Sequence, residues 1–266
     1  MDIHRHNAAA WNAESGSGDS PWCQPVSAEI IAAARRGEWS VILTPNKAVP
    51  RDWFGALEGA RVLCLAGSGG QQAPVLAAAG ADVTVLDISS AQLAKDSLVA
   101  GRDGLKLAII EADMTQLGEH VSGPFDLIFH PTSNLFIADL APVWRQCADI
   151  LRPGGRLLSG FVNPDFWLFD HDAIDTGAPL QVTHRLPFDA ARDLPKSLVQ
   201  ERIEKQAALE FSHSLEAQIG GQIAAGLLIA GFYEDDWSDE ATPLNAYMPT
   251  SFATLAVKPG GADLAR

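Results

Sequence analysis

A turn made of small residues follows an apolar run in the first third of the chain. Gly67, Ser68, Gly69 and Gly70 come after residues 62–66 and before a stretch with helical spacing. Only small residues let backbone amides approach a ligand closely, and such a turn lies at the carboxyl edge where doubly wound sheets bind ligands. We therefore expect main-chain groups of this turn to contact a ligand, although glycine also serves purely structural turns.

An acidic side chain stands at the end of the next apolar run. Asp87 comes 17 residues after Gly70, which is the placement of an acid that accepts hydrogen bonds from ribose hydroxyls. A dinucleotide fingerprint would need a third glycine where the chain has Gln72, whose bulk would obstruct close helix–strand packing. The spacing indicates a nucleotide-containing ligand and leaves a nicotinamide-dependent oxidoreductase as the less favoured alternative.

Short apolar runs alternate with helical stretches through the middle of the chain, which predicts an α/β fold with a doubly wound, mostly parallel sheet. We expect strands at residues 62–66, 83–87, 107–111, 127–130, 156–161 and 251–257. We expect helices between them at residues 72–79, 90–100 and 140–151, and a turn at 152–155. This order places the glycine turn and Asp87 at the same edge of the sheet.

The segment before the sheet has a different character. Residues 14–20 are rich in Ser and Gly and predict a flexible loop, whereas residues 27–36 predict a helix that starts at a serine cap and ends before Gly37. We expect residues 1–60 to form an arm and helices that cover the ligand site.

The second half of the chain carries an interruption. Residues 163–205 are rich in Pro, Asp and aromatic residues and have weak periodicity, which is typical of a lid or binding loop. A further helix is predicted at residues 215–230, with Gly231 as its C-cap. Residues 61–266 are thus expected to form one domain with a lid insertion at about 163–205.

Five motifs occur in a fixed order between residues 61 and 161. They are Val62 to Gly70, Val85 to Ser89, Glu111 to Met114, Phe125 to Ile128, and Leu151 to Gly155. Together they resemble the class I S-adenosylmethionine-dependent methyltransferases. The resemblance implies a Rossmann-like sheet of seven strands, S-adenosylmethionine as cofactor, and a small-molecule methyl acceptor as partner.

The resemblance also implies roles for individual residues. The loop from Ala66 to Gly70 would contact the methionine part of the cofactor, Asp87 the ribose, and Asp113 the adenine amino group. The adenine would lie between Ile88 and Met114. The full set of expected cofactor-binding residues is Trp22, Ala66, Gly67, Ser68, Gly70, Gln71, Asp87, Ile88, Gln92, Asp113, Met114, His130, Ser133 and Asn134.

The glycine loop departs from the family pattern at three positions. Cys64, Ala66 and Ser68 stand where the pattern has an acid and its first two glycines, and a neutral thiol cannot accept the hydrogen bonds of that acid. The variant loop resembles that of a bacterial subgroup with two glutamines after the glycines. The missing acid also raises the alternative of a module that binds the cofactor without transferring its methyl group.

Two kinds of residue could compensate for the missing acid. One kind is Gln71 and Gln72, which follow the loop directly. The other is the N-terminal arm, where the faces of Trp11 and Trp22 could attract the positive sulfonium. The two tryptophans could equally serve only to pack the arm against the domain.

Two histidines are candidate catalytic residues. Methyl transfer chiefly requires alignment and exclusion of water, but a base helps when the acceptor carries a proton. His130 ends a predicted strand at the cofactor edge, and His213 starts a predicted helix. Either could instead be a structural hydrogen-bonding group. Five aromatic residues of the lid region suggest a small, partly apolar acceptor, or simply core packing: Phe161, Phe166, Trp167, Phe169 and Phe188.

The composition of the chain limits its expected partners, metal sites and cellular location. The net charge of −14 opposes binding to a phosphate backbone, so we expect no nucleic-acid partner. The three cysteines show no disulfide or zinc spacing, and no metal site is expected. No apolar run approaches the ~18 residues of a membrane span, and the first residues lack the apolar core of a signal peptide. We expect a cytoplasmic enzyme without membrane association.

Overall fold

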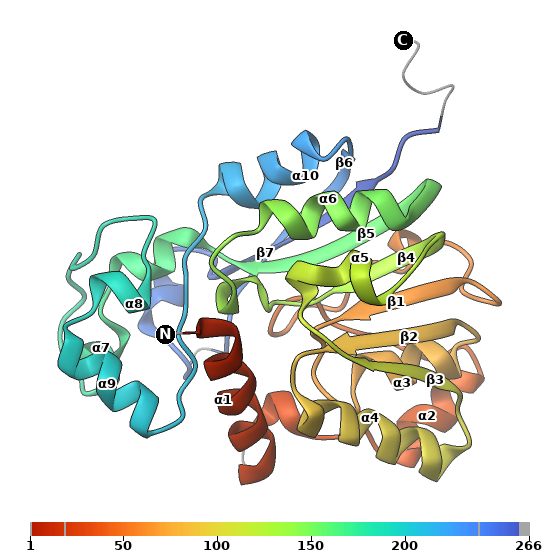
Figure 1. Cartoon of the computed structure of the whole chain (residues 1–266), viewed down its shortest axis with the longest axis horizontal. Helices are drawn as coiled ribbons and strands as arrows, with labels where there is room; N and C mark the ends of the chain where they lie inside the picture. The colour runs from red at the N-terminus through yellow and green to blue at the C-terminus, as the bar shows by residue number, and fades with distance from the viewer. Residues whose placement is uncertain (1, 19, 239, 261–266) are drawn as a thin grey trace.

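The computed structural model describes residues 2–18, 20–238 and 240–260. Their centre is a seven-stranded sheet in the order β3-β2-β1-β4-β5-β7-β6 (Figure 1). Strand β7 is antiparallel to both of its neighbours, and the pairs among the first five strands are parallel. The strands are β1 (Arg61–Leu65), β2 (Asp82–Asp87), β3 (Leu107–Glu111), β4 (Phe125–His130), β5 (Leu151–Val162), β6 (Leu228–Asp235) and β7 (Ser251–Val257). The predicted α/β fold is therefore confirmed.

Each face of the sheet is buried by its own layer of helices. One face packs against α2 (Ala28–Arg35), α3 (Gln72–Ala78) and α4 (Ser90–Asp103). The other is covered by α5 (Leu117–His120), α6 (Ala141–Ile150) and α10 (Gly221–Ala224) (Figure 1). Strand β1 serves both cores, because successive side chains of a strand point to opposite faces.

The N-terminal arm is a helix, α1 (Ile3–Ser17), so the predicted loop at residues 14–20 is wrong for residues 14–17. Asp2 caps its start by accepting from the N–H of Arg5, and Gly18 ends it at a φ of 81°. The side chain of Asn12 accepts hydrogen bonds from Ser89 and from the N–H of Ala91 at the start of α4. These contacts support a helix whose last three residues, Ser15 to Ser17, have weak helix propensity.

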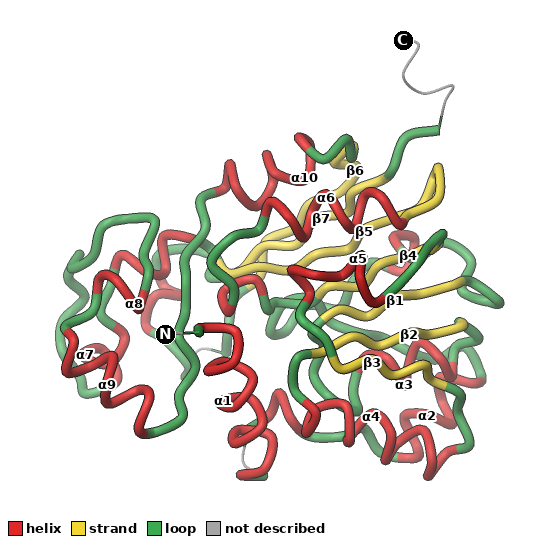
Figure 2. Tube along the Cα trace, in the orientation of Figure 1, coloured by secondary structure: helices red, strands yellow, loops and turns green. Residues whose placement is uncertain are grey.

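The segment between β5 and β6 consists of short helices joined by loops (Figure 2). It contains a 3₁₀ turn (Pro164–Leu168) and the short helices α7 (His171–Asp175), α8 (Ala190–Asp193) and α9 (Lys196–Glu204). These pieces enclose a separate apolar cluster, which includes Phe166, Trp167 and Phe188. The insertion, here residues 163–210, lies beyond one end of the sheet, on the side of α1 away from α4 (Figure 1). The predicted domain limits at 60 and at 163–205 stay predictions.

Three further sequence predictions differ from the structure. The helix predicted at 215–230 ends by Ala225, where Gly226 at a φ of 88° stops it. Gly231 is not a C-cap; it lies in β6, where a Cβ would come within 2.7 Å of the Trp53 ring. The turn at 152–155 falls inside β5, as a register irregularity against β4. The other predicted strands and helices are confirmed with small shifts at their ends.

Among the described residues, no helix is both long and apolar enough to cross a membrane.

Candidate functional site

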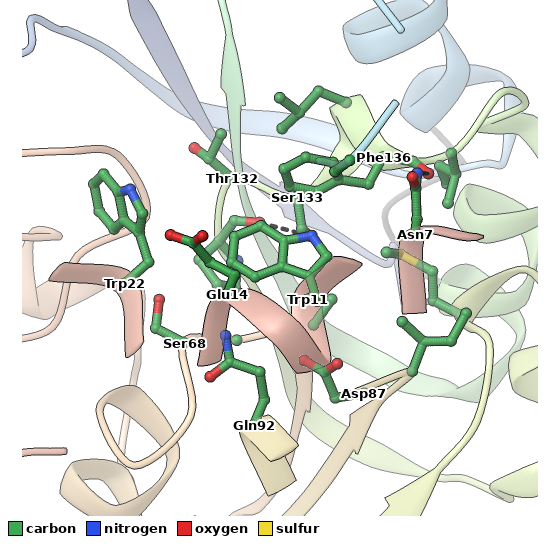
Figure 3. A pocket seen from close by; sticks show the side chains of 18 of the residues that line it. Asn7, Trp11, Glu14, Trp22, Ser68, Asp87, Gln92, Thr132, Ser133 and Phe136 are labelled. Carbon is green, nitrogen blue, oxygen red and sulfur yellow. Dashed lines mark hydrogen bonds between the residues drawn. The ribbon is translucent and has the colours of Figure 1, made fainter. Parts of the chain in front are cut away.

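A cavity of about 430 Å³ lies at the carboxyl end of the parallel strands. The loops after β1, β2, β3 and β4 form its floor. Helix α1 lies over it with Asn7, Trp11 and Glu14, as Figure 3 shows. The last part of the insertion, from α9 to residue 210, closes a further side with Arg202 and Glu210. Segments from the start, the middle and the last third of the chain thus enclose one space.

Ten of the residues expected from the sequence to bind the cofactor line this cavity. They come from the arm and from the loops at the ends of four strands, which explains why a parallel sheet brings them together. These residues are Trp22, Ala66, Gly67, Ser68, Asp87, Ile88, Gln92, Asp113, Met114 and Ser133. Their individual roles stay predictions.

Asp87 ends β2 at the floor of the cavity. Its carboxylate accepts a hydrogen bond of 2.7 Å from the N–H of Ser89. Burial raises the pKa of Asp87 to about 7, the bond from Ser89 opposes this rise, and the nearby charge of Asp96 adds to it. A ligand hydroxyl that donates a hydrogen bond to this carboxylate would stabilise its charged form.

Asp113 follows β3 and is shared between the sheet and the arm. Its Oδ1 accepts hydrogen bonds from the N–H and the hydroxyl of Thr115, both 2.8 Å long. Its Oδ2 lies 2.6 Å from Nδ1 of His4 in α1. The arm therefore reaches across the cavity to the acid that the sequence assigned to the adenine amino group. Sequence reasoning missed His4, because no helix was predicted at the start of the arm.

Asn7 ties α1 to both neighbouring parts of the cavity wall. Its Nδ2 donates to the carbonyl oxygens of Phe136 and Leu209, at 2.8 and 3.0 Å. Its Oδ1 accepts from the N–H of Leu209 at 2.9 Å, and the side chain is almost fully buried. One amide thus links the arm, the segment after β4 and the insertion.

The glycine loop packs directly on α4. The N–H of Gly69 donates to Oε1 of Gln92, and the N–H of Gly70 donates to Oδ1 of Asp96, both at 2.9 Å. A Cβ at Gly69 would lie 2.3 Å from the carbonyl oxygen of Gln92, so no larger residue fits. Gly70 therefore faces α4 and does not line the cavity.

The two glutamines proposed to compensate for the missing acid have main-chain partners in the arm and the loop before β1. Gln71 does not line the cavity, and its amide donates to the carbonyl oxygen of Pro21 at 2.8 Å. Gln72 does line the cavity, but its Oε1 accepts from the N–H of Ile42 at 3.2 Å. Trp11 and Trp22 both line the cavity, and Trp11 also packs edge-on against Phe136.

His130 and His213 lie behind the cavity wall and are not among its lining residues. His130 is fully buried, with Nε2 2.9 Å from the hydroxyl of Ser133, and burial lowers its pKa to about 4. His213 contacts the carbonyl oxygens of Asn134 and Ile137 through Nε2, at 3.1 and 2.9 Å. Asn134 also lies outside the cavity and donates to Gln218. Neither histidine touches the space where a reaction would occur.

The insertion end of the cavity combines charge with apolar surface. Arg202 pairs with Asp172 at 3.0 Å on its outer side. Burial raises the pKa of Glu210, while the charge of Arg202 and a hydrogen bond from Trp167 oppose the rise. Trp237 and Val162 supply apolar wall. The lid aromatics expected from the sequence do not line the cavity; four of them pack in or against the insertion's apolar cluster, and Phe161 packs against Phe252.

No group of three or more His, Cys, Asp or Glu side chains suited to a metal ion occurs among the residues that the structure describes.

Known proteins share both the sequence and the fold. Residues 63–159 match the family described as "Methyltransferase domain". The chain is 46% identical to "Uncharacterized methyltransferase YbaJ" of Bacillus subtilis, over 95% of this chain and 97% of that protein. It is 30% identical to "Ubiquinone biosynthesis O-methyltransferase" of Aromatoleum aromaticum, over 62% of this chain and 71% of the relative.

A solved structure shares the fold over almost the whole chain. It is magnesium protoporphyrin IX methyltransferase from Synechocystis with bound S-adenosylhomocysteine, at a TM-score of 0.57 and 13% identity. The match covers 97% of this chain and all of that one. The fold, the domain match and the end-to-end similarity to the Bacillus protein agree, and the chain belongs to the class I S-adenosylmethionine-dependent methyltransferases.

Proposed function

We propose that this methyltransferase acts on a small-molecule acceptor that enters the insertion end of the cavity. The observation that carries the proposal is the enclosure itself: α1 and the insertion cover the same space that the strand-end loops line. A pocket of about 430 Å³ suits a cofactor with a small partner, whereas a polymeric acceptor would need an open groove. The nicotinamide-dependent alternative and the non-catalytic module lose their support with the family assignment.

The residues of the cavity fit the cofactor. A buried carboxyl group, Asp87, stands beside a turn whose small residues expose main chain to the cavity, and this suits a ribose next to an amino-acid moiety. In this placement Asp87 would hold the ribose and Asp113 the adenine amino group. Ala66, Gly67 and Ser68 would contact the methionine part. Bound S-adenosylmethionine supplies an electrophilic methyl group on a positively charged sulfur.

The chain's own residues align the acceptor and keep water out. Trp11 and Phe136 close one side of the cavity with apolar rings. Pro131, Thr132 and Ser133 follow β4 and supply polar and apolar wall on the floor. Such enclosure favours in-line displacement, because it fixes the approach of the acceptor and removes competing solvent.

The charges on the cavity wall favour one class of acceptor. Four carboxyl side chains line the cavity, namely Glu14, Asp87, Asp113 and Glu210, whereas Arg202 is the single Lys or Arg among its described lining residues. Arg202 is also paired with Asp172. Burial raises the pKa of Asp87 and of Glu210 and so reduces their negative charge, but a wall with more acids than bases still favours cations over anions. We therefore propose an uncharged or amine-bearing acceptor rather than a carboxylate.

Three probes of equal size would test the acceptor class. Binding of benzylamine, benzyl alcohol and benzoate to the protein saturated with S-adenosylhomocysteine would be measured by ligand-observed NMR. We expect benzylamine to bind most tightly and benzoate most weakly. In Glu210→Gln the preference for benzylamine over benzyl alcohol should shrink, while affinity for S-adenosylhomocysteine stays within about twofold. Preferential binding of benzoate would contradict the proposed acceptor class.

A further inference from the structure

The position of the glycine loop is set by side chains of α4 that never reach the cavity. Asp96 accepts from the N–H of Gly70 and is only 2% exposed, and it is not a lining residue. The other side of Gly70 is closed, because a Cβ there would lie 3.0 Å from Pro25. The loop is thus held between the segment before α2 and the carboxyl group of Asp96.

Cys64 lies in the same core layer as the inner face of α4. Its side chain is buried in the apolar cluster that includes Leu93 of α4, while Leu63 and Leu65 face the opposite core. Burial raises the pKa of the Cys64 thiol, and the charge of Asp96 raises it further. The thiol is therefore a poor hydrogen-bond acceptor for the loop, and the carboxyl group in this layer comes from α4 instead.

Burial of the charged form of Asp96 destabilises the folded protein. Burial raises its pKa to about 7, and the hydrogen bond from Gly70 offsets only part of that rise. The neighbouring ammonium of Lys95 does not neutralise it, since Lys95 donates to the carbonyl oxygens of Ser15 and Cys23. A residue needed only to fill space would be more stable here as a neutral side chain.

We propose that Asp96 is a positioning residue for the cofactor, which holds the glycine loop through Gly70 in place of the acid that the family pattern has at position 64. The inference rests on the proposed placement of the methionine part beside that loop. Asp96 does not touch the cofactor; it acts through the main chain of residues 69 and 70. The family pattern has this carboxylate on the strand under the loop, whereas this chain has it on the helix beside the loop.

The test transfers the carboxyl group from position 96 back to position 64. In Asp96→Asn the dissociation constant for S-adenosylhomocysteine, measured by calorimetry, should rise about tenfold, the scale of one charge-assisted hydrogen bond. The melting temperature of the cofactor-free protein at pH 8 should rise, because a buried charge is removed. In Cys64→Asp alone affinity should also fall, since two carboxyl groups would then share one core. The double variant should bind more tightly than either single variant.

Two controls separate this role from a general loosening of α4. Asp103→Asn, near the far end of α4, should leave affinity unchanged. Exchange of the Gly70 amide proton in the cofactor-free protein, measured by NMR, should accelerate in Asp96→Asn; if that variant does not fold, Asp96→Ser is measured instead. Unchanged affinity, unchanged exchange, or no recovery in the double variant would overturn the role of Asp96. Failure of the wild-type protein to bind S-adenosylhomocysteine, with accelerated exchange in the variant, would instead count against the proposed cofactor placement.

Discussion

The two ends of the cavity are built in different ways. The floor comes from loops that follow β1 to β4, so a continuous stretch of about seventy residues supplies Ala66, Asp87, Asp113 and Ser133. The insertion end is assembled from α1, from residues 202–210 and from Trp237, which are far apart in the sequence. In the proposed placement, the floor holds a cofactor that a large family shares, and the acceptor contacts segments that lie outside the matched domain.

The largest expected effect lies at the floor. Asp87→Ala removes the carboxylate that we assign to the ribose, and a charge-assisted pair of hydrogen bonds is worth roughly 3 kcal/mol, or about a hundredfold in affinity. Calorimetry with S-adenosylhomocysteine measures the loss. Asp82→Ala, at the exposed start of the same strand, should bind normally. Equal affinity in Asp87→Ala and wild type would contradict the proposal that the cofactor binds at the floor of the cavity.

Asn7→Ala tests whether the two ends close together. The substitution leaves the buried N–H and carbonyl of Leu209 without their partner, which costs about 2 kcal/mol. We expect hydrogen exchange to accelerate in α1 and in residues 202–210 at the same time. His6→Ala, which loses one partly buried contact to Ala207, should show a smaller change. Faster exchange in only one segment would mean that the arm and the insertion move independently.

Replacement of Asp87 by asparagine separates stability from binding. Burial raises the pKa of Asp87 to about 7 from an ordinary value of 3.8, so the fold favours its neutral form. The contribution of Asp87 to stability is therefore present below about pH 4 and is lost as the pH rises towards 7. Asp87→Asn should raise the unfolding free energy at pH 8 by about 1 kcal/mol or more, while weakening cofactor binding. Denaturant unfolding at pH 5 and pH 8 measures the difference, which a surface acid would not produce.

The smallest effect is expected from His130. Burial lowers its pKa to about 4, below the ordinary value of 6.5, so its contribution to stability is present above pH 6.5 and is lost as the pH falls towards 4. His130→Gln should reduce the loss of unfolding free energy between pH 6.5 and pH 4. It should not change how cofactor affinity depends on pH between pH 6 and pH 8. NMR titration of the imidazole protons tests the pKa directly. A midpoint near 6.5 would place the ring in contact with solvent.

The sequence was a good guide wherever a local pattern had one physical meaning. Apolar runs that end in Asp87 or His130 became parallel strands, because only extended buried segments accommodate such runs. The acids at the end of β2 and after β3 then reached the cavity through topology alone. This reasoning covered the floor of the site and six of the seven strands, but it gave no strand order and missed β6.

The rest depended on tertiary contacts that leave no local trace. Residues 14–17 have loop-like composition, yet α1 persists because Asn12 and Asn7 bind distant segments. Gly231 resembled a helix stop, but Gly226 ends the helix five residues earlier. The contact between Gly70 and Asp96 becomes visible only once α4 is packed beside the loop. Burial, which removes His130 and His213 from the cavity, likewise has no signature in the residues themselves.

The clasp formed by Asn7 has a practical consequence for engineering. A chimera that grafts a foreign insertion into this scaffold would retain Asn7, so the new segment must present a free N–H and carbonyl where Leu209 now lies. Such a graft should succeed only when its backbone follows that path. Because Asn7 contacts only the main chain of residue 209, natural sequences of this type should retain Asn7 while the side chain at 209 varies, proline excepted.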